Sequence, residues 1–293
     1  MSFTILDRGR HEALALPEAR EMLSFELGAH DRLLRAPQGS SRRNEYKAIY
    51  RDWVPLMRRF QSANHVDGVE ALGFTPVLIQ WCQPWLAQRD VLEVGCGSGV
   101  GARALAKIAR TVCAVDVSEP LLASARASID HAVRFEVGDV TDRLPFADER
   151  FDAVYWNDVA EHLHPEDLPH ALAEIRRVLR PGGSLLTITC HLDDGPHDAS
   201  RMILPPGCAP LGVHMQEFTN ASWARLLSRA GFRPLMPAFG IGPLWKTPLR
   251  RAVKRAMRPS SLVELVEGTW LTRALVPARW LFGANVVFSV ASR

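Results

Sequence analysis

The sequence predicts an α/β protein with a doubly wound, mostly parallel sheet. Short apolar runs bounded by turn residues recur along the chain and alternate with amphipathic segments. Because these runs are continuously apolar, we expect strands that helices cover on both faces. The predicted strands are Val91–Val94, Thr111–Val115, Val133–Val137, Phe151–Trp156, Ser184–Thr189, Phe232–Pro237 and Asn285–Ala291.

The remaining segments predict how the chain is organised around this sheet. Apolar residues recur at helical spacing after Pro17, and the polar stretch Pro37–Asn44 is predicted to be a loop. We expect an N-terminal helical cap over residues 1–65 and a sheet-containing domain over residues 66–293, with a helical insertion at about 243–282 before the last strand. Further helices are predicted at Thr75–Leu86, Arg103–Ala109, Pro120–Ile129 and Leu168–Leu179.

Composition narrows the class of protein. Apolar residues make up 47% of the 293 residues, as in a globular protein with a full core, and the net charge of +3 is too small to imply a nucleic-acid partner. The five cysteines form no C-x-x-C pair, which argues against a disulfide framework. No apolar stretch reaches the ~18 residues of a membrane span, and the N-terminus lacks the apolar core of a signal peptide. We therefore expect a cytoplasmic protein.

A glycine-rich turn follows the first predicted strand. Residues 91–99 read VLEVGCGSG and open the helix that follows. Glycines at such a point let the backbone turn sharply and let a ligand approach the main chain. A dinucleotide site would need a further glycine where the chain has Val100, so a nicotinamide or flavin cofactor is disfavoured.

An acidic residue ends the second predicted strand. Asp116 lies 19 positions beyond Gly97, the separation at which a carboxylate can accept hydrogen bonds from both ribose hydroxyls of a nucleoside. Its alternative role is to cap the following helix, together with Ser118. The glycine turn before it favours the ligand-binding role.

These motifs resemble class I S-adenosylmethionine-dependent methyltransferases. VLEVGCGSG is similar to the signature of that family, and the resemblance extends over roughly residues 88–235, about half of the chain. It implies a Rossmann-like methyltransferase fold and S-adenosylmethionine as the cofactor. The other segments that agree with the family, in order, are Asp116, Gly138–Val140, Phe151–Leu163, Val178–Gly183 and His214–Phe232.

The resemblance also implies which residues hold the cofactor. Glu93 and the Gly95–Gly99 turn would face the methionine moiety, Asp116 the ribose, Asp139 the adenine amine and Asn157 the reactive sulfonium. For Asp139 the alternative is a turn-forming role, and for Asn157 a cap at the end of a strand. The implied cofactor-binding residues are Glu93, Gly95, Cys96, Gly97, Gly99, Asp116, Val117, Asp139, Val140 and Asn157.

The acceptor must be sought outside the cofactor turn. Methylation of base amines usually goes with an Asn/Asp-Pro-Pro-aromatic box, whereas residues 157–160 read NDVA. No alternation of aromatic and basic residues suggests a stacking platform for nucleic-acid bases. A small-molecule substrate, and no nucleic acid, is therefore expected.

Four polar residues are candidates for the catalytic groups. The segment His191–Asp198 should emerge at the carboxyl edge of the sheet, where ligands bind in such folds. His197 is the predicted base and Asp198 its orienting carboxylate, with His214 and His162 as further candidates. A Gly-Pro-His-Asp segment followed by His-x-x-Glu-aromatic-Thr is similar to bacterial methyltransferases that act on saccharides and related small molecules. The alternative for His197 and Asp198 is a surface loop.

Three further features are open to two interpretations. Asp193, Asp194 and His197 could chelate a divalent ion, but they form no clear octahedral ligand set, so no metal is predicted. Tyr46 is either a lid over the cofactor or part of ordinary helix packing. Residues 245–258 carry six Lys/Arg and no acid, which fits either a helix lying on an anionic membrane surface or a solvated helix.

The sequence thus predicts a methyltransferase of natural-product or glycan biosynthesis. Our first hypothesis is O-methylation of a hydroxyl on a sugar or secondary metabolite, where a base would assist. N-methylation of an amine-bearing small molecule is the second. A cofactor-binding protein that transfers no methyl group is the third.

Overall fold

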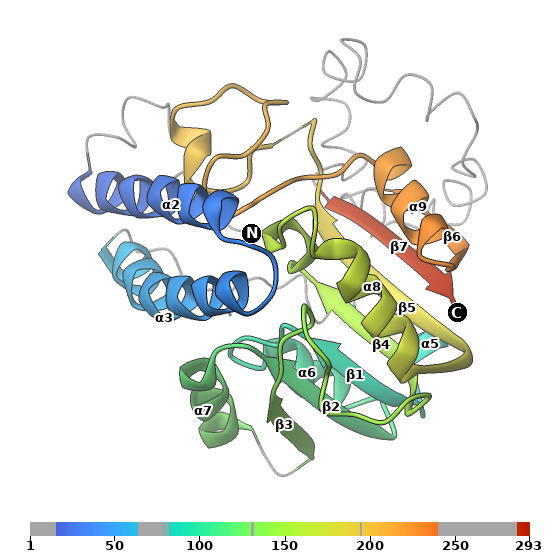
Figure 1. Cartoon of the computed structure of the whole chain (residues 1–293). Helices are drawn as coiled ribbons and strands as arrows, with labels where there is room; N and C mark the ends of the chain where they lie inside the picture. The colour runs from blue at the N-terminus through green and yellow to red at the C-terminus, as the bar shows by residue number, and fades with distance from the viewer. Residues whose placement is uncertain (1–15, 64–78, 80–81, 130–131, 194, 240–285) are drawn as a thin grey trace, which may run out of the picture.

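A mostly parallel sheet forms the centre of the molecule (Figure 1). The computed structural model describes residues 16–63, 79, 82–129, 132–193, 195–239 and 286–293. Over these residues the sheet has seven strands in the order β3-β2-β1-β4-β5-β7-β6, in which only β7 runs antiparallel to its neighbours. The strands are β1 (Asp90–Val94), β2 (Thr111–Asp116), β3 (Val133–Val137), β4 (Phe151–Asn157), β5 (Leu179–Cys190), β6 (Arg233–Phe239) and β7 (Val286–Ser292).

The predicted α/β fold is confirmed, and every predicted strand is present. The largest difference is in β5, which begins at Leu179 rather than Ser184. Leu179 pairs with Phe151, and Ser184 pairs with Ala153, so the intervening turn residues bulge out of the ladder. The order reverses between β1 and β4, so the carboxyl ends of these two strands border the crevice where ligands bind in open α/β sheets.

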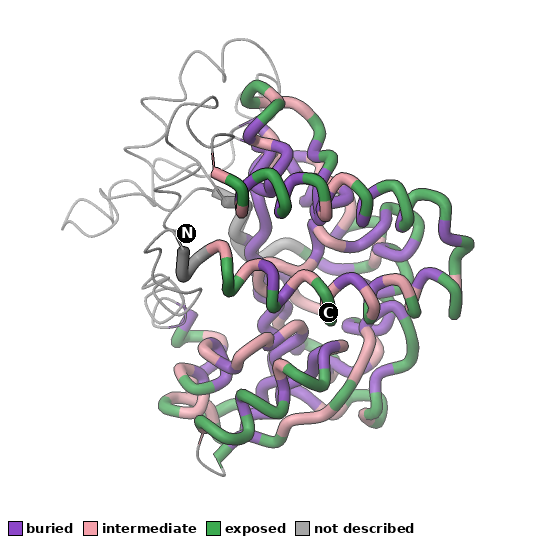
Figure 2. Tube along the Cα trace, turned by 90° about the vertical axis from the view of Figure 1, so that its left-hand side faces the viewer, coloured by how far each residue is buried: buried purple, intermediate pink, exposed green. Residues whose placement is uncertain are grey.

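Helices cover both faces of this sheet. On one face, β-strand residues such as Leu92 and Val154 pack with α8 and α9, and on the other, Val91 and Ala153 pack with α5 and α6. Figure 2 shows that the buried residues are concentrated between these helices and the sheet. The helices are α2 (Pro17–Arg35), α3 (Ser40–Ala63), α5 (Gln83–Leu86), α6 (Val100–Leu105), α7 (Glu119–Ser128), α8 (Leu168–Val178) and α9 (Asn220–Arg229), with short 3-10 turns η2 (Ala160–His162) and η3 (Ala199–Met202).

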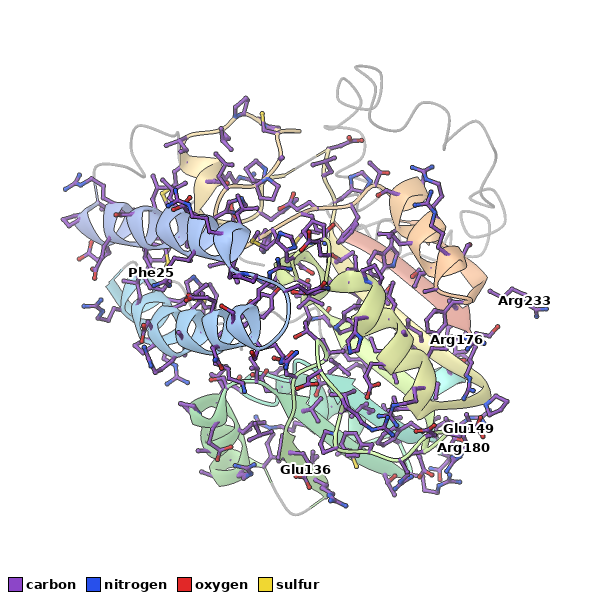
Figure 3. All side chains as sticks on the ribbon, viewed as in Figure 1. Phe25, Glu136, Glu149, Arg176, Arg180 and Arg233 are labelled. Atoms are coloured by element: carbon purple, nitrogen blue, oxygen red, sulfur yellow. The ribbon has the colours of Figure 1, made fainter. Side chains whose placement is uncertain are left out.

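The N-terminal helices α2 and α3 lie side by side and rest on the sheet domain. Phe25 of α2 packs with residues of both helices (Figure 3). The predicted loop over Pro37–Asn44 is wrong from Ser40 onward, because α3 already begins there after Gly39, whose φ of 100° ends the connection. The division into a cap and a sheet domain stays a prediction, and the predicted insertion at 243–282 lies outside the described residues.

A buried polar cluster fastens α3 to the segment before α8. Arg42, only 3% exposed, donates to Asp167 Oδ1 at 3.2 Å and to Glu166 Oε2 at 2.8 Å. Tyr46 donates its hydroxyl to Asp167 Oδ2 at 2.9 Å and accepts from the His164 amide at 2.8 Å. Buried charge is tolerated here because each group has a partner of opposite charge or a donor.

The opposite edge of the sheet, at the amino ends of β1 and β4, carries a structural ion-pair network. The carboxylate of Asp90 forms ion pairs with Arg110 at 2.9 Å and with Arg180 at 3.2 Å. Arg180 also forms an ion pair with Asp152 at 2.6 Å. Arg180 and Glu149 mark this edge in Figure 3.

Within the part of the chain that the structure describes, none of the helices combines the length and the apolar composition that a membrane span requires.

Candidate active site

The glycine turn between β1 and α6 bends as the sequence predicts. Gly97 has φ of 52°, and Gly95 has φ of 72°, both in the left-handed region that favours glycine. A Cβ on Gly95 would lie 2.2 Å from Cγ2 of Val159, so a side chain at this position has no space. The backbone of the turn is therefore held close against the segment that follows β4.

Asp116 joins the turn to the end of β2. Its Oδ2 accepts from the Gly97 amide at 2.8 Å, and its Oδ1 accepts from the Ser118 amide at 2.8 Å. The N-cap position of α7 belongs to Ser118, so Asp116 is not the helix cap. Burial raises the pKa of Asp116 despite these backbone hydrogen bonds.

Two further carboxylates near the turn have an unsatisfied oxygen. Glu93 on β1 is 5% exposed, and its Oε2 is buried without a hydrogen-bond partner. Burial, followed by the charge of Asp116, raises the pKa of Glu93 to about 8. Asp139 holds Thr141 through Oδ1, at 2.9 Å to the amide and 2.6 Å to the hydroxyl, while its Oδ2 is buried without a partner. Both oxygens could accept from a bound ligand.

The other predicted cofactor residues lie in the glycine turn or at the carboxyl ends of the neighbouring strands. Cys96 is buried within the turn, and Val140 follows Asp139 into the core. Val117 is half-buried after Asp116. Asn157 is the last residue of β4, and its Nδ2 donates to Asp158 Oδ2 at 3.0 Å. Asn157 therefore lies at the carboxyl end of β4, and its role toward the cofactor stays a prediction.

The tyrosine of α3 that faces the site is Tyr50, one turn beyond Tyr46. The structure gives Tyr46 the packing role, since its hydroxyl is engaged by Asp167 and His164. The ring of Tyr50 meets that of His162 edge-on, with centroids 5.8 Å apart. Burial raises the pKa of Tyr50, and the charges of Asp116 and Glu161 add to this, so its hydroxyl is within electrostatic reach of both acids.

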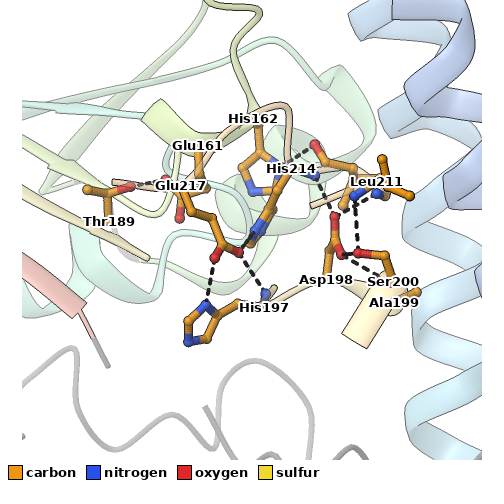
Figure 4. A network of polar contacts seen from close by, with 12 residues as sticks. Glu161, His162, Thr189, His197, Asp198, Ala199, Ser200, Leu211, His214 and Glu217 are labelled. Carbon is orange, nitrogen blue, oxygen red and sulfur yellow. Dashed lines mark hydrogen bonds and ion pairs between the residues drawn. The ribbon is translucent and has the colours of Figure 1, made fainter. Parts of the chain in front are cut away.

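Histidines 197 and 214 share one carboxylate, Glu217 (Figure 4). The Nδ1 atom of His197 lies 3.1 Å from Glu217 Oε2, and that of His214 lies 2.9 Å from Oε1. The Glu217 carboxylate is fully buried, and Oε1 also accepts from the His197 amide at 2.6 Å. Burial acts to raise the pKa of Glu217, but hydrogen bonds from the two histidines lower it to about 2.

Backbone pairing explains why these side chains meet. The Phe218 amide donates to the carbonyl of Cys190 at 3.1 Å, and the Leu192 amide donates to Phe218 O at 2.9 Å. The segment before α9 thus lies along the end of β5, which places Glu217 beside the segment that carries His197. The Met215 amide donates to the Glu161 carbonyl at 2.8 Å and fixes the segment to η2.

The predicted pairing of His197 with Asp198 is wrong. Asp198 instead organises its own loop: Oδ1 accepts from the Ser200 amide at 3.0 Å, and Oδ2 accepts from the amides of Gly212 at 2.8 Å and His214 at 3.2 Å. Short polar side chains commonly satisfy nearby backbone donors in this way. Adjacent residues also point apart, which leaves His197 to a carboxylate 20 positions later.

Glu161 and His162 complete the polar cluster. The ring of His162 meets that of His214 edge-on, with centroids 4.6 Å apart, and burial lowers the pKa of His162 to about 3. For His214, burial acts to lower the pKa, but the hydrogen bond to Glu217 raises it to about 10. Burial and the charge of Asp158 raise the pKa of Glu161 to about 7.

A second buried carboxylate ties α2 to the same loop. Glu26 accepts from the Ala199 amide at 2.8 Å through Oε2 and from Trp53 Nε1 at 2.8 Å through Oε1. Burial, followed by the charge of Asp198, raises the pKa of Glu26 to about 7. The loop that carries His197 is therefore bonded to the N-terminal helices.

Known proteins resemble the region that forms this site. A family model described as a methyltransferase domain matches residues 92–187. A protein of Mycolicibacterium smegmatis, named a probable S-adenosylmethionine-dependent methyltransferase, is 38% identical over 148 residues, which cover 50% of this chain and 52% of that protein. The malonyl-[acyl-carrier protein] O-methyltransferase of Pectobacterium atrosepticum is 40% identical over 107 residues, covering 36% and 40%. The chain spans about half the length of the curated relatives that it matches.

Residues 92–187 are therefore similar to a methyltransferase domain, and the relatives that match about half of the chain are named as probable S-adenosylmethionine-dependent methyltransferases.

A solved structure agrees with this domain in fold. The 1,6-didemethyltoxoflavin-N1-methyltransferase of Burkholderia thailandensis, crystallised with bound 1,6-didemethyltoxoflavin and S-adenosylhomocysteine, superposes with a TM-score of 0.54 at 20% identity. The superposition covers 88% of this chain and 92% of that protein. At this identity the likeness shows the shared fold.

The residues around the glycine turn fit S-adenosylmethionine. The orphaned Oε2 of Glu93 is suited to the ligand's ammonium group, and the orphaned Oδ2 of Asp139 to the adenine amine. The carboxylate of Asp116 lies at the carboxyl edge between them, where the ribose is expected. When bound, the cofactor would supply an electrophilic methyl group.

Four residues that shape the candidate site were not predicted. Glu217 had a signal in the sequence, because it follows His214 by three positions in the His-x-x-Glu pattern. Glu161 lies next to the predicted His162. Glu26 and Tyr50 lie more than 100 residues before the loops that they contact, and no local pattern links them.

Proposed function

We propose that this protein transfers a methyl group from S-adenosylmethionine to a hydroxyl of a sugar or secondary metabolite. The observation that carries the proposal is the buried His197–Glu217 pair, 3.1 Å apart, at the carboxyl edge that also holds the cofactor turn. Transfer to a hydroxyl needs a group that takes its proton as the methyl arrives, and imidazole is suited to that task. Methyl transfer otherwise depends mainly on alignment of donor and acceptor.

His197 is the base in this proposal. Donation from Nδ1 to Glu217 fixes the tautomer of the imidazole, so Nε2 is the ring nitrogen that takes the proton in this proposal. Glu217 stabilises the imidazolium that forms, as an orienting carboxylate does in hydrolytic triads. His214 lies 2.9 Å from the other oxygen of Glu217 through Nδ1, so it is suited to orient that carboxylate.

Two of the relatives' names support an oxygen acceptor. The malonyl-[acyl-carrier protein] enzyme is an O-methyltransferase, and so is the ubiquinone biosynthesis enzyme of Thiobacillus denitrificans, 27% identical over 176 residues. We infer a small-molecule partner and no nucleic acid. All five cysteines are free, which favours the cytoplasm. The proposed membrane-contacting segment 245–258 lies outside the described residues.

The test uses a labelled methyl donor with panels of sugars, phenolic metabolites and amines. We expect label in hydroxyl acceptors, and transfer to amines alone would contradict the proposal, as would cofactor binding without any transfer. His197→Ala should lower turnover at least about tenfold while cofactor affinity changes less than about threefold. His170→Ala, at an exposed position on α8, is the matched control. Near-normal turnover of His197→Ala would show that the base lies elsewhere.

A further inference from the structure

Three buried side chains at the carboxyl edge form a set with the composition of a metal site. A carboxylate oxygen of Glu161, the sulfur of Cys190 and a ring nitrogen of His214 all lie within 4.8 Å of one another. None of the three residues is more than 4% exposed. We propose that Glu161, Cys190 and His214 bind one zinc ion.

Each ligand projects from an element that the rest of the structure fixes. Glu161 lies in η2, and Cys190 is the last residue of β5. His214 is held by its amide, which donates to Asp198 Oδ2 at 3.2 Å. The next amide, that of Met215, donates to the carbonyl of Glu161 at 2.8 Å, so the backbone segments of two ligands are directly bonded. Sites on such fixed elements keep their geometry better than sites on loose loops.

The orientation of His214 is that of a zinc-binding histidine. Its Nδ1 lies 2.9 Å from Glu217 Oε1, which directs the other ring nitrogen, Nε2, away from that carboxylate. Histidines that bind zinc almost always donate their second ring N–H to a carboxylate or carbonyl, which fixes the tautomer and raises the basicity of the ligand atom. Figure 4 shows Glu217 between His214 and His197, with Glu161 near His214.

One carboxylate oxygen of Glu161 points independently to a ligand at this cluster. Its Oε2 accepts from the Thr189 hydroxyl at 2.9 Å, whereas Oε1 is buried without a hydrogen-bond partner. A buried carboxylate oxygen left in this state costs free energy unless a cation or donor meets it. The side chain is completely buried, so bulk water does not satisfy that oxygen.

The charge balance of the cluster also favours a divalent cation. The carboxylates of Asp158, Glu161 and Glu217 all face His214. A bound Zn²⁺ would compensate this negative potential and hold the thiol as thiolate.

Zinc fits the ligand types and their spacing better than magnesium or calcium. A thiolate with an imidazole and a carboxylate suits zinc, whereas the two hard cations prefer oxygen alone. Tetrahedral zinc with bonds of about 2.0–2.3 Å separates its ligand atoms by roughly 3.4 Å, so the ligand atoms need to approach one another by at most about 1.4 Å. Three protein ligands leave a fourth position for water or another group.

The experiment measures metal binding directly and needs no methyl acceptor, so its failure would leave the proposed function untouched. The purified 293-residue chain is treated with chelator, loaded with Co²⁺ or Zn²⁺ and desalted. We expect one metal ion per chain and, with Co²⁺, a thiolate-to-cobalt charge-transfer band in the near ultraviolet. Metal that washes off the folded protein, or a Co²⁺ spectrum without the thiolate band, would overturn the proposal.

Matched variants assign the ligands. Cys190→Ser should abolish the charge-transfer band, and Glu161→Gln should weaken Zn²⁺ binding at least about tenfold. Cys208→Ser, which removes a half-exposed cysteine, should leave both properties unchanged. A band that persists in Cys190→Ser, or disappears in Cys208→Ser, would contradict the assignment. Should Cys190→Ser fail to fold, X-ray absorption of the Zn²⁺-loaded wild type decides: a sulfur neighbour at about 2.3 Å supports the site, and oxygen and nitrogen neighbours alone refute it.

Discussion

Replacing Glu93 by Gln should stabilise the cofactor-free protein at alkaline pH and weaken cofactor binding. The pKa of Glu93 is raised from 4.5 to about 8, first by burial and then by the charge of Asp116. Folded protein therefore keeps this proton over a pH range in which the unfolded chain has released it. Stability is lost as the pH rises from about 4.5 to 8, because the folded state binds more protons than the unfolded state there.

The magnitude follows from the difference between the two pKa values. A shift of about 3.5 units at ~1.4 kcal/mol per unit gives an upper bound of ~5 kcal/mol, and we expect ~3–5 kcal/mol. Glu93 accepts a hydrogen bond from the backbone N–H of Ala102. The amide oxygen that Glu93→Gln introduces would accept the same hydrogen bond. The stability of the variant relative to wild type should therefore be greater at pH ~9 than at pH ~5 by that amount.

Urea denaturation of both proteins at the two pH values, without cofactor, measures this difference. Glu119→Gln is the control, because it removes a carboxylate that is 57% exposed on α7. If the free energy of unfolding depended on pH equally in wild type and Glu93→Gln, the inference that the buried carboxyl of Glu93 holds its proton would be refuted. Calorimetry should show weaker binding of S-adenosylmethionine by Glu93→Gln, by about 1.5–3 kcal/mol, if the Oε2 of Glu93 receives the ligand's ammonium group.

Two further substitutions test the turn and the cap. Asp116→Ala should weaken binding of S-adenosylmethionine by about 1.5–3 kcal/mol in calorimetry while the far-ultraviolet circular dichroism stays unchanged, and an unaltered dissociation constant would place the ribose elsewhere. Tyr46→Phe should lower the free energy of unfolding by about 1–2 kcal/mol in urea, because Asp167 loses a donor and the His164 amide loses an acceptor. Unchanged stability would show that water replaces the hydroxyl.

The strands and the cofactor turn were predictable because their signals are local. Apolar runs between turn residues marked every strand, and the spacing from Gly97 to Asp116 placed both at one edge of the sheet. The start of α3 was missed because its first turn, SSRRN, is polar throughout. Its Arg42 is buried by partners more than 120 residues away, which no local pattern reveals.

The candidate base was found in the sequence, but its partner was not. Proximity along the chain favoured Asp198, which in the structure satisfies the amides of its own loop. Glu217 reaches His197 only because the segment before α9 pairs with the end of β5. Such pairings between distant segments decide which side chains meet, and motif spacing carries no information about them.

The N-terminal helices are hydrogen-bonded to the rest of the molecule at two separate points. Arg42 and Tyr46 of α3 donate to Asp167, and Glu26 of α2 accepts from the Ala199 amide. The helices and the segments that they contact therefore form one structural unit that is discontinuous in the sequence. In a chimera that exchanged residues 16–63 alone with those of a relative, Asp167 and the Ala199 amide would lose the hydrogen-bond partners that α2 and α3 now provide. Engineering of a new acceptor preference should exchange the helices together with the loop that contains Ala199 and the segment that contains Asp167, while the cofactor turn stays in place.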